Sequence, residues 1–496
     1  MRLSVLLDAL QPRSHHFAPD VECRGLAYDS RCVTPGMIFF ALPGARVDGA
    51  RFAAQAVSQG AVAVVTESDA PLPSGIPHIR VDSARQALAR AAAAFHGHPS
   101  RALRLIGVTG TNGKTTVAYL VRHLLTAAGV RTGMLGTVEY DTGNRVLPAH
   151  RTTPESLDLQ QLFATMRDSG CGACVMEVSS HALCQHRVEG VEFHAAAFTN
   201  LTRDHLDYHG DMEAYFAAKC RLFNQMTTPA AGGAAVINAD DPYGERLGQA
   251  LAPHAVLTFG LSPQSALRAD VLELGAETTR LRVSFPRGAE MELSFPLIGR
   301  HNVSNGLAAL GLGLAMGVDI ATLQRAMEQA PPAPGRLQPV SCGQPFGVFV
   351  DYAHTDDALR QVLATLREVT RGRLHLMFGC GGDRDAGKRP RMGAVAAAGA
   401  DTTLITSDNP RSESPEEIAR QIAEGYRQVR GDGCDEELDR SRAIDQILRR
   451  AQPGDTVLLA GKGHETYQEY QEAGERIAAP FDDRVHAAAT LRHLGS

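Results

Sequence analysis

The sequence contains no apolar run long enough to span a bilayer, no internal repeat and no low-complexity tract. It also lacks a basic excess, because 49 lysines and arginines stand against 55 aspartates and glutamates, for a formal net charge of −6. A nucleic-acid binder would carry a basic face, so the charge balance argues against that class. Any anionic ligand must therefore be held by local groups and not by an overall positive field.

Secretory signals are missing as well. The first residues, Met1 to Leu7, form a stretch that is too short and is soon interrupted by Asp8. Nine cysteines are an odd number for a disulfide framework, so we expect reduced thiols and a cytoplasmic location. Cys171 and Cys174 form a lone C-x-x-C, whereas a zinc site needs more ligands. We interpret this pair as small residues that enter a buried strand.

The length of 496 residues is too great for one core and predicts three α/β domains. From Leu103 onward, apolar strands alternate with helix-period stretches, which predicts a mostly parallel sheet flanked by helices. Around residues 269–296 the pattern becomes period two and predicts an antiparallel flap. The stretch Pro331 to Gly335 cannot continue a helix and predicts a linker before a second α/β alternation.

The strands expected in that second alternation are Val348–Asp351, Leu374–Phe378, Thr402–Ile405 and Thr456–Ala460. We therefore expect a small α/β domain at residues 1–101, a central domain at 102–335 and a Rossmann-like α/β domain at 336–496.

A phosphate-binding loop follows the strand that begins at Leu103. Its residues are Gly110, Thr111, Asn112, Gly113, Lys114, Thr115 and Thr116. Glycines let backbone N–H groups curl around phosphate oxygens, and the following helix N-terminus adds its positive end. Lys114 would supply charge to the β and γ phosphates, and the Thr115 hydroxyl is placed to bind Mg²⁺. The loop predicts nucleotide binding but does not separate a ligase from a kinase or a motor.

Candidate metal ligands follow two further strands. Glu177 ends one buried strand, and the carboxyl ends of parallel strands are where open α/β sheets bind ligands. His205 lies in a stretch rich in acids and imidazoles after the next strand and is a candidate for a second cation. Lys219 is flanked by small residues on a predicted helix, and taken alone it is expected to be an exposed helix lysine.

These strings together resemble the muramyl ligase family, in order and over nearly the whole chain. The matching motifs are Gly110–Thr115, Met176–His181, Asn200–His209, Gly299–Asn305, Asp351–Thr355, Phe378–Asp385, Asp408–Arg411 and Gly461–Glu465. The resemblance implies an ATP- and Mg²⁺-dependent ligase of peptidoglycan synthesis. It would activate the γ-carboxylate of a UDP-linked muramoyl dipeptide as an acyl phosphate and join it to an amino acid, meso-diaminopimelate.

The resemblance also implies roles for single residues. Lys219 matches the family's carbamylated lysine, whose added carboxylate binds Mg²⁺. The UDP end would be held by Tyr28, Ser30, Ala45, Arg46 and Val47, and the muramoyl dipeptide by Arg151, Thr152, Thr153, Ser179, Gln185 and Arg187. The adenine and ribose would be contacted by His301, Asn302, Asn305, Arg336 and Asp351. The sequence departs from the family at Arg151, where asparagine is common, at Asp356, where proline is frequent, and at the turn Ala45–Val47.

The amino-acid pocket would be formed by Arg384, Asp408, Asn409, Pro410, Arg411, Gly461 and Glu465. Arg411 follows the strand Thr402–Ile405, and its planar fork suits the distal carboxylate that distinguishes diaminopimelate from lysine. A helix capped at Ser412 would make this stretch only a polar turn. The residues Ser414, Pro415 and Glu417 give a better helix start, which leaves Arg411 free in the loop.

Three alternatives stay open on the sequence alone. One is a muramyl ligase that adds L-lysine, and another is a folylpolyglutamate-type ligase, which shares the phosphate loop. The third is a binding protein that uses the loop as a nucleotide switch without ligation. The expected partners are small-molecule substrates alone, and we expect a monomer without a membrane span.

Overall fold

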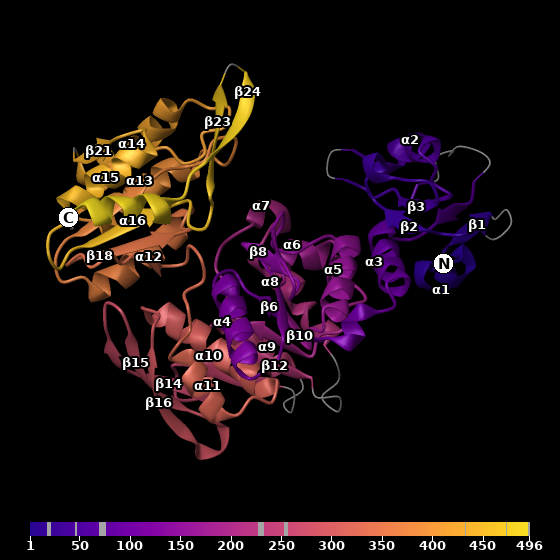
Figure 1. Cartoon of the computed structure of the whole chain (residues 1–496), viewed down its shortest axis with the longest axis horizontal. Helices are drawn as coiled ribbons and strands as arrows, with labels where there is room; N and C mark the ends of the chain where they lie inside the picture. Colours follow the sequence, from indigo (N-terminus) through magenta and orange to yellow (C-terminus); the bar gives the residue numbers. More distant parts are fainter. Residues whose placement is uncertain are drawn as a thin grey trace. The chain divides into compact units, whose positions relative to one another are not determined.

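The computed structural model describes residues 1–16, 21–44, 47–68, 76–226, 233–251, 256–431, 433–472 and 474–494. The chain divides into two compact units, Met1–Arg268 with Asn305–Leu323, and Ala269–Ser304 with Gln324–Ser496. Figure 1 shows the order of the elements along the chain. No helix among the described residues is both long and apolar enough to cross a membrane.

The N-terminal part of the first unit is a small α/β layer structure. Its sheet has the strand order β1 (Ser14–His16), β5 (His78–Arg80), β4 (Ala63–Thr66), β3 (Met37–Phe40) and β2 (Gly25–Ala27). Only the β1–β5 pair is antiparallel among the pairings of this sheet. Helices α1 (Leu3–Leu10) and α3 (Ala84–Phe95) bury their apolar faces in one cluster with Ile38 and Val65. The short helix α2 (Ala53–Ser58) contributes Ala53 and Ala56 to a second cluster.

The larger sheet of the first unit is mostly parallel, as the sequence predicts. From β13 its order is β13 (Val256–Gly260), β12 (Ala234–Asn238), β11 (Ala195–Phe198), β6 (Arg104–Thr109), β10 (Ala173–Glu177), β7 (Thr132–Leu135), β8 (Glu139–Asp141) and β9 (Val146–Pro148). The helices of this region are α4 (Lys114–Ala127), α5 (Ser156–Asp168), α6 (Ser180–Cys184), α7 (Leu206–His209), α8 (Met212–Cys220) and α9 (Pro242–Ala250). Strands β6, β10 and β11 are nearly all apolar because helices cover both faces.

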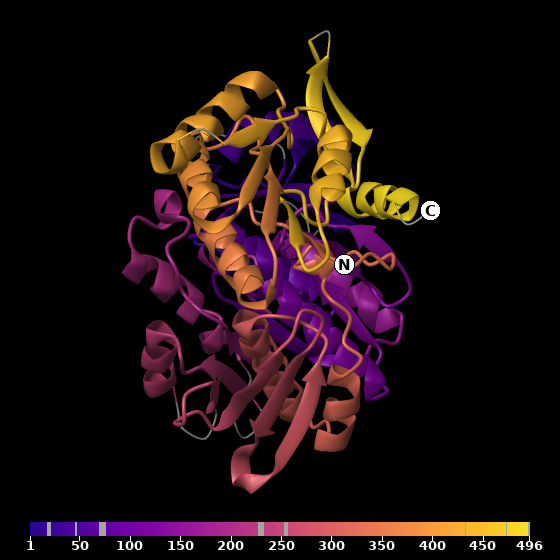
Figure 2. The ribbon, with the colours of Figure 1, turned by 90° about the vertical axis from the view of Figure 1, so that its left-hand side faces the viewer.

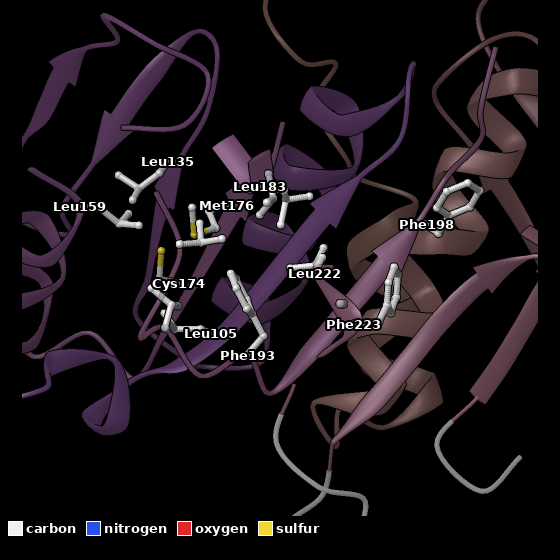
Figure 3. Packing of buried hydrophobic residues seen from close by; sticks show 14 of the residues in the cluster. Leu105, Leu135, Leu159, Cys174, Met176, Leu183, Phe193, Phe198, Leu222 and Phe223 are labelled. Carbon is white, nitrogen blue, oxygen red and sulfur yellow. The ribbon is translucent and has the colours of Figure 1, made fainter. Parts of the chain in front are cut away.

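Figure 3 shows the core beneath this sheet, where Leu105, Cys174, Met176 and Phe193 lie close together. Cys171 and Cys174 are both buried and free, which confirms their interpretation as small residues entering a buried strand. Helix α10 (Arg300–Ala315) runs from the second unit into the first, β14 (Leu267–Leu274) from the first into the second, and α11 (Ile320–Met327) follows α10. The expected antiparallel flap is present as β15 (Thr279–Ser284) paired with β16 (Glu290–Phe295).

The C-terminal part is a second α/β structure. Its sheet has the order β17 (Gln338–Pro339), β18 (Gly347–Asp351), β22 (Thr456–Ala460), β19 (Leu374–Phe378), β20 (Thr402–Ile405) and β21 (Cys434–Glu436). The flanking helices are α12 (Asp356–Val369), α13 (Lys388–Gly399), α14 (Pro415–Arg430), α15 (Arg440–Arg450) and α16 (Asp483–Leu494). A separate hairpin, β23 (Tyr467–Glu472) with β24 (Glu475–Pro480), projects from these layers in Figures 1 and 2.

Helix α14 begins where the capping pattern predicts. The Ser414 side chain accepts a hydrogen bond from the Glu417 backbone N–H at 3.2 Å, and Pro415 occupies the first turn. Glu416 and Glu417 lie at the positive end of the helix and Arg427 and Arg430 at the negative end, so both termini are electrostatically favourable. A helix capped at Ser412 is therefore wrong, and residues 408–411 are left to the loop.

We predict that Gly425→Ala destabilises the C-terminal part. Gly425 of α14 lies against the Pro390 carbonyl, while Gly393 of α13 lies against the Ile422 carbonyl, so a methyl group at either position would overlap backbone. Overpacking of this kind costs about 1–3 kcal/mol or more. As a control, Gly248→Ala in α9 would meet only the Ile237 side chain at 3.9 Å and should be neutral or stabilising. Thermal unfolding of both variants checks this, and equal melting temperatures would contradict it.

Candidate active site

The phosphate loop lies between β6 and α4, as expected. Gly110 and Gly113 have φ values of +151° and +88°, which side chains with a Cβ rarely adopt. The Lys114 ammonium folds back onto the loop and donates to the carbonyl oxygens of Gly110 at 3.0 Å and Thr111 at 2.9 Å. Thr115 and Thr116 are buried in the first turn of α4. The Lys114 side chain is therefore hydrogen-bonded within its own loop.

A second loop, residues 199–202 after β11, braces the phosphate loop. The Asn200 side chain accepts from the Asn112 N–H at 2.9 Å, and the Thr199 hydroxyl donates to the Asn112 carbonyl at 2.6 Å. The Thr202 N–H donates to the Thr111 hydroxyl at 3.0 Å. Asn200 therefore holds the loop in shape, a role that no local sequence pattern indicated.

Lys219 contradicts the expectation of an exposed helix lysine. Its residue is 1% exposed, and its ammonium donates to the Gly110 carbonyl at 2.7 Å. The nitrogen lies 4.5 Å from the ring centroid of Tyr215. Burial, together with the nearby charge of Lys114, holds the pKa of Lys219 well below its ordinary value. Residues far away in the sequence bury this lysine, so its neighbours in the helix could not reveal its position.

Glu177 lies at the end of β10 and is 1% exposed. Its carboxylate accepts from the Thr115 hydroxyl at 3.0 Å, the Thr137 N–H at 2.8 Å and the Thr137 hydroxyl at 3.1 Å. Hydroxyl and carboxylate oxygens are the donors that Mg²⁺ prefers, so Thr115 and Glu177 fit that ion. No group of three or more His, Cys, Asp or Glu residues that could hold a metal occurs within the described parts of the chain. A cation here would need oxygens from its ligands as well.

His205 immediately precedes α7, has a positive φ of 54° and lies among aromatic rings. Its ring centroid is 4.9 Å from that of His181 and 6.2 Å from that of Tyr215. Burial lowers the pKa of His205, and the charges of Lys114 and Lys219 add to that effect although Asp204 opposes it. A neutral imidazole is the form that binds metal, so His205 is suited to the cation role.

Residues expected to hold the muramoyl dipeptide converge beside Glu177. The Thr153 hydroxyl donates to the Glu177 carbonyl at 2.9 Å, and the Arg187 guanidinium donates to the Thr153 carbonyl at 2.9 Å. Arg187 also donates to the Gln185 side chain at 2.7 Å. The Ser179 and Thr152 hydroxyls are 3.3 and 3.1 Å from those of Thr153 and Thr137, respectively. The structure therefore brings these residues together.

Glu155 is a member of this cluster that the sequence did not single out. It is buried, and its carboxylate pairs with Arg187 at 3.1 Å, Arg85 at 3.5 Å and Arg151 at 3.6 Å. Three arginines from separate elements thus share one acid. Arg151 itself keeps a side chain that is 55% exposed, which leaves it accessible to an anionic ligand.

The expected UDP-binding residues are only partly described. The Tyr28 hydroxyl donates to Asp158 at 2.7 Å, and the Ser30 hydroxyl donates to Gln55 at 2.9 Å. Val47 is 40% exposed. Ala45 and Arg46 lie outside the described residues.

The expected adenine and ribose contacts fall in both units. Asn305 of the first unit lies against Gly113, where a Cβ would overlap its side-chain oxygen. In the second unit, Asp351 is buried and accepts backbone N–H groups of Leu337 at 2.7 Å and Ala353 at 2.8 Å. The remaining contacts there are Arg336 stacked 4.9 Å from the Tyr352 ring, Asn302 bonded to the Ile298 carbonyl at 2.9 Å, and His301 3.2 Å from the Thr365 hydroxyl.

The expected amino-acid pocket lies at the carboxyl ends of β19, β20 and β22. The Asn409 amide donates to Glu465 at 2.8 Å, and Gly461 lies against Asp408. Burial and the charge of Asp408 raise the pKa of Glu465. Pro410 is buried within the same loop. Arg384 is exposed, and both its side chain and that of Arg411 lie near Gly381.

Arg411 is not free in its loop, which corrects the expectation from the sequence. Its Nε donates to the Glu469 carboxylate at 2.9 Å, and its Nη1 donates to the Gly382 carbonyl at 2.8 Å. Glu469 belongs to the β23–β24 hairpin, which the sequence analysis did not predict. Alternation of charged and polar residues in that segment gave no apolar strand signal.

Buried cations connect the loops of this pocket. Lys462 is 0% exposed and donates to the Asn409 side chain and the Tyr467 carbonyl, both at 2.8 Å. Arg440, paired with buried Asp483 at 2.6 Å, donates to the carbonyls of Ser407 and Ala460, both at 3.1 Å. These contacts join the loop after β20 to the loop after β22.

Comparison with known proteins agrees with this geometry. Residues 22–96 match the Mur ligase family catalytic domain, residues 108–313 the Mur ligase middle domain, and residues 335–463 the Mur ligase glutamate ligase domain. The UDP-N-acetylmuramoyl-L-alanyl-D-glutamate–2,6-diaminopimelate ligase of Solibacter usitatus is 47% identical over 504 residues, covering 100% of this chain and 99% of the relative. The chain belongs to the Mur ligase family.

Two further similarities extend over nearly the whole of this Mur ligase. A Streptomyces coelicolor protein with the same printed name is 46% identical over 477 residues, covering 94% of this chain and 92% of the relative. A solved structure of such a ligase is 34% identical with a TM-score of 0.68, covering 96% of each chain. The expected three-domain α/β fold and ATP-dependent ligase class are therefore confirmed.

We predict that Lys219→Met stabilises this Mur ligase when metal, nucleotide and carbon dioxide are absent. The folded-state pKa of Lys219 lies below its ordinary value of 10.5, so the lysine destabilises the fold at low pH. That cost is full below the folded-state pKa and disappears as the pH rises toward the unfolded value.

Urea unfolding at about pH 7 and about pH 9 measures the effect, and the gain should shrink at the higher pH. Lys388→Met is the matched control, because Lys388 lies at the surface and donates to the His354 carbonyl. A Lys219→Met protein that is less stable at both pH values would contradict the prediction.

Proposed function

We propose that this Mur ligase joins meso-diaminopimelate to UDP-N-acetylmuramoyl-L-alanyl-D-glutamate and so makes the UDP-linked tripeptide of peptidoglycan synthesis. The observation that carries the proposal is that the loops after β20 and β22, which hydrogen bonds join, carry Arg411 together with Asp408 and Glu465. Arg411 would pair with a distal carboxylate, and Asp408 and Glu465, which Lys462 approaches at 3.4 and 3.6 Å, would pair with an ammonium. The printed names of the relatives at 46–47% identity support the same substrate.

The chemistry begins with a carboxylate that does not react with amines at neutral pH. The γ-carboxylate of the D-glutamate end attacks the γ-phosphate of ATP, ADP leaves, and an acyl phosphate forms. An uncharged amine of the amino acid then attacks the acyl carbon, and the tetrahedral intermediate expels phosphate. Lys114 screens the charge repulsion of the first step, and the loop backbone orients the phosphates.

Magnesium is the expected cofactor, and when bound it neutralises phosphate charge and aligns the reacting oxygens. Thr115 and Glu177 would hold one ion, and His205 with Lys219 would hold a second. Lys219 needs a carboxylate for that role. A buried lysine with a lowered pKa presents a neutral amine, which attacks carbon dioxide, loses one proton and becomes a carbamate.

The remaining assignments belong to the same proposal. Residues 1–101, with Tyr28, Ser30 and the turn at Val47, would bind the UDP end, and residues 102–335 would bind ATP and the dipeptide. Residues 336–496 would bind the amino acid. We further propose a monomeric enzyme of the cytoplasm. A ligase that adds lysine, or a nucleotide switch, would each give a different result below.

We predict that the native enzyme prefers meso-diaminopimelate to L-lysine in kcat/KM by roughly 10²- to 10⁴-fold. The lower bound allows for Glu469, which already pairs with Arg411 and reduces the cost of leaving that arginine without a substrate carboxylate. Arg411→Ala should remove most of the preference by weakening diaminopimelate use alone. Arg420→Ala, an exposed arginine on α14, is the matched control.

An amino-acid panel with the UDP-linked dipeptide makes this measurement. Equal values for the two amino acids in the native enzyme would overturn the substrate but not the reaction. Phosphate release without an amino-acid acceptor would instead favour the nucleotide switch.

We predict that Lys219 carries a carbamate. The chain has only four lysines, Lys114, Lys219, Lys388 and Lys462, so a ¹³C spectrum with labelled bicarbonate should show one well-resolved carbamate signal. Lys219→Arg should abolish the signal, whereas Lys388→Arg should retain it. Lys219→Ala should be nearly inactive and partly restored by a small added carboxylate. An active alanine variant without added carboxylate would contradict the assignment.

A further inference from the structure

Strand β23 lies along the loop of residues 408–411 and is bonded to it at successive positions. The Arg411 N–H donates to the Glu469 carbonyl at 3.1 Å, and the Glu469 N–H donates to the Asn409 side chain at 2.9 Å. The Gln468 amide donates to the Asp408 carbonyl at 2.8 Å, and Arg411 forms an isolated β-bridge with Tyr470. The hairpin that projects in Figures 1 and 2 thus begins beside the loop of residues 408–411.

The Glu469 side chain adds a charged contact to this loop. Its Oε2 accepts from Arg411 Nε at 2.9 Å and from Arg476 Nη2 at 2.8 Å. The Glu469 and Arg411 side chains are 19% and 13% exposed, whereas that of Arg476 is 58% exposed. The two arginines share the Glu469 carboxylate, and both also lie near Asp383, whose pKa their charges help to lower.

The geometry of the fork determines where an anion can bind. A guanidinium has five N–H donors in one plane and binds a carboxylate along a pair of them. Glu469 occupies Nε and the Gly382 carbonyl accepts from Nη1, so the Nη2 end is the part of the fork that these contacts leave to a ligand. Arg411 also has a positive φ of 53°, an unfavourable backbone conformation that the contacts with β23 help to maintain.

We propose that Glu469 is a positioning residue that fixes the orientation of Arg411 and thereby sets the selection for an amino acid with a distal carboxylate. This inference rests on the proposed function and deepens it. Arg411 has a long side chain that would populate several rotamers without a partner. Glu469 holds it at Nε, which leaves Nη2 for the carboxylate of a substrate.

The opposite role is a competitor, in which Glu469 occupies the place of the substrate carboxylate. The two roles predict opposite changes. Removing a competitor would lower the KM for diaminopimelate, whereas removing a positioning residue raises it. Measuring the reaction with L-lysine as the amino acid distinguishes both roles from general damage to the fold. Lysine has no distal carboxylate for Arg411 to bind, so neither role should affect its use.

The test compares Glu469→Ala and Glu469→Gln with the native enzyme. Glu469→Ala should raise the KM for diaminopimelate on the order of ten- to a hundredfold, the range expected for a lost hydrogen bond to a charged group. The kcat, the KM values for ATP and the UDP-linked dipeptide, and the lysine reaction should change by no more than a few-fold. Glu469→Gln keeps an acceptor for Arg411 Nε and should recover most of the preference. Glu475→Gln, an exposed acid on β24, is the matched control and should behave as native.

Three outcomes would overturn the inference. They are an unchanged KM for diaminopimelate in Glu469→Ala, a lowered one, and an equal loss for both amino acids. Failure of the proposed function is distinguishable, because the native enzyme would then show no preference for diaminopimelate. If the native enzyme prefers diaminopimelate and Glu469→Ala keeps that preference, only the role proposed for Glu469 is wrong.

Discussion

The side chains of Lys114 and Lys219 both donate to one carbonyl oxygen, that of Gly110, and the charges around the phosphate loop depend on this arrangement. Lys114 donates to it at 3.0 Å and Lys219 at 2.7 Å, in a place where Lys219 is 1% exposed. Two like charges so close in a poorly solvated site repel each other, so the more buried amine tends to lose its proton. A neutral amine can take up carbon dioxide, and its carbamate would then attract Lys114 and a cation. The repulsion between the two lysines thus favours the carbamate that we propose at Lys219.

The amino-acid pocket uses buried charge in another way. Arg389, Arg440 and Lys462 are each 1% exposed or less, yet each donates hydrogen bonds to oxygens of the surrounding loops. Burying such an ion pair costs desolvation free energy that the attraction between the charges only partly offsets, so these pairs contribute little to stability. Their value here is geometric. Arg389 joins Gly381 to Glu413, Arg440 joins Ser407 to Ala460, and Lys462 orients the Asn409 amide toward Glu465.

The sequence predicted elements whose signal is local and missed contacts that depend on distant residues. Strands β19, β20 and β22 have the predicted bounds because they are short runs of mostly apolar and β-branched residues. Helix α14 begins at its predicted cap because Ser414 and Pro415 act on adjacent backbone. Residues 110–116 were recognisable as a phosphate-binding loop because a glycine-rich turn followed by Lys and Thr, between a strand and a helix, is typical of few other structures. The burial of Lys219 depends on Gly110, 109 positions away, and the partner of Arg411 lies 58 positions away on a hairpin without apolar alternation. Both separations are much longer than a single helix or strand, so no local sequence pattern contains both members of either pair.

Selection in a chain with a net charge of −6 must come from local complementarity, and we propose that the loop after β20 provides it. An amino acid with two ends, each carrying an ammonium and a carboxylate, requires an acid and a base set side by side at its distal end. Asp408 supplies the acid: one of its oxygens is buried and makes no hydrogen bond within the described residues, although Lys462 lies 3.4 Å away. Arg411 supplies the base, and Glu469 holds its plane. Lysine would satisfy the acid but leave the arginine end without a carboxylate, so discrimination follows from the half of the pocket that lysine cannot fill.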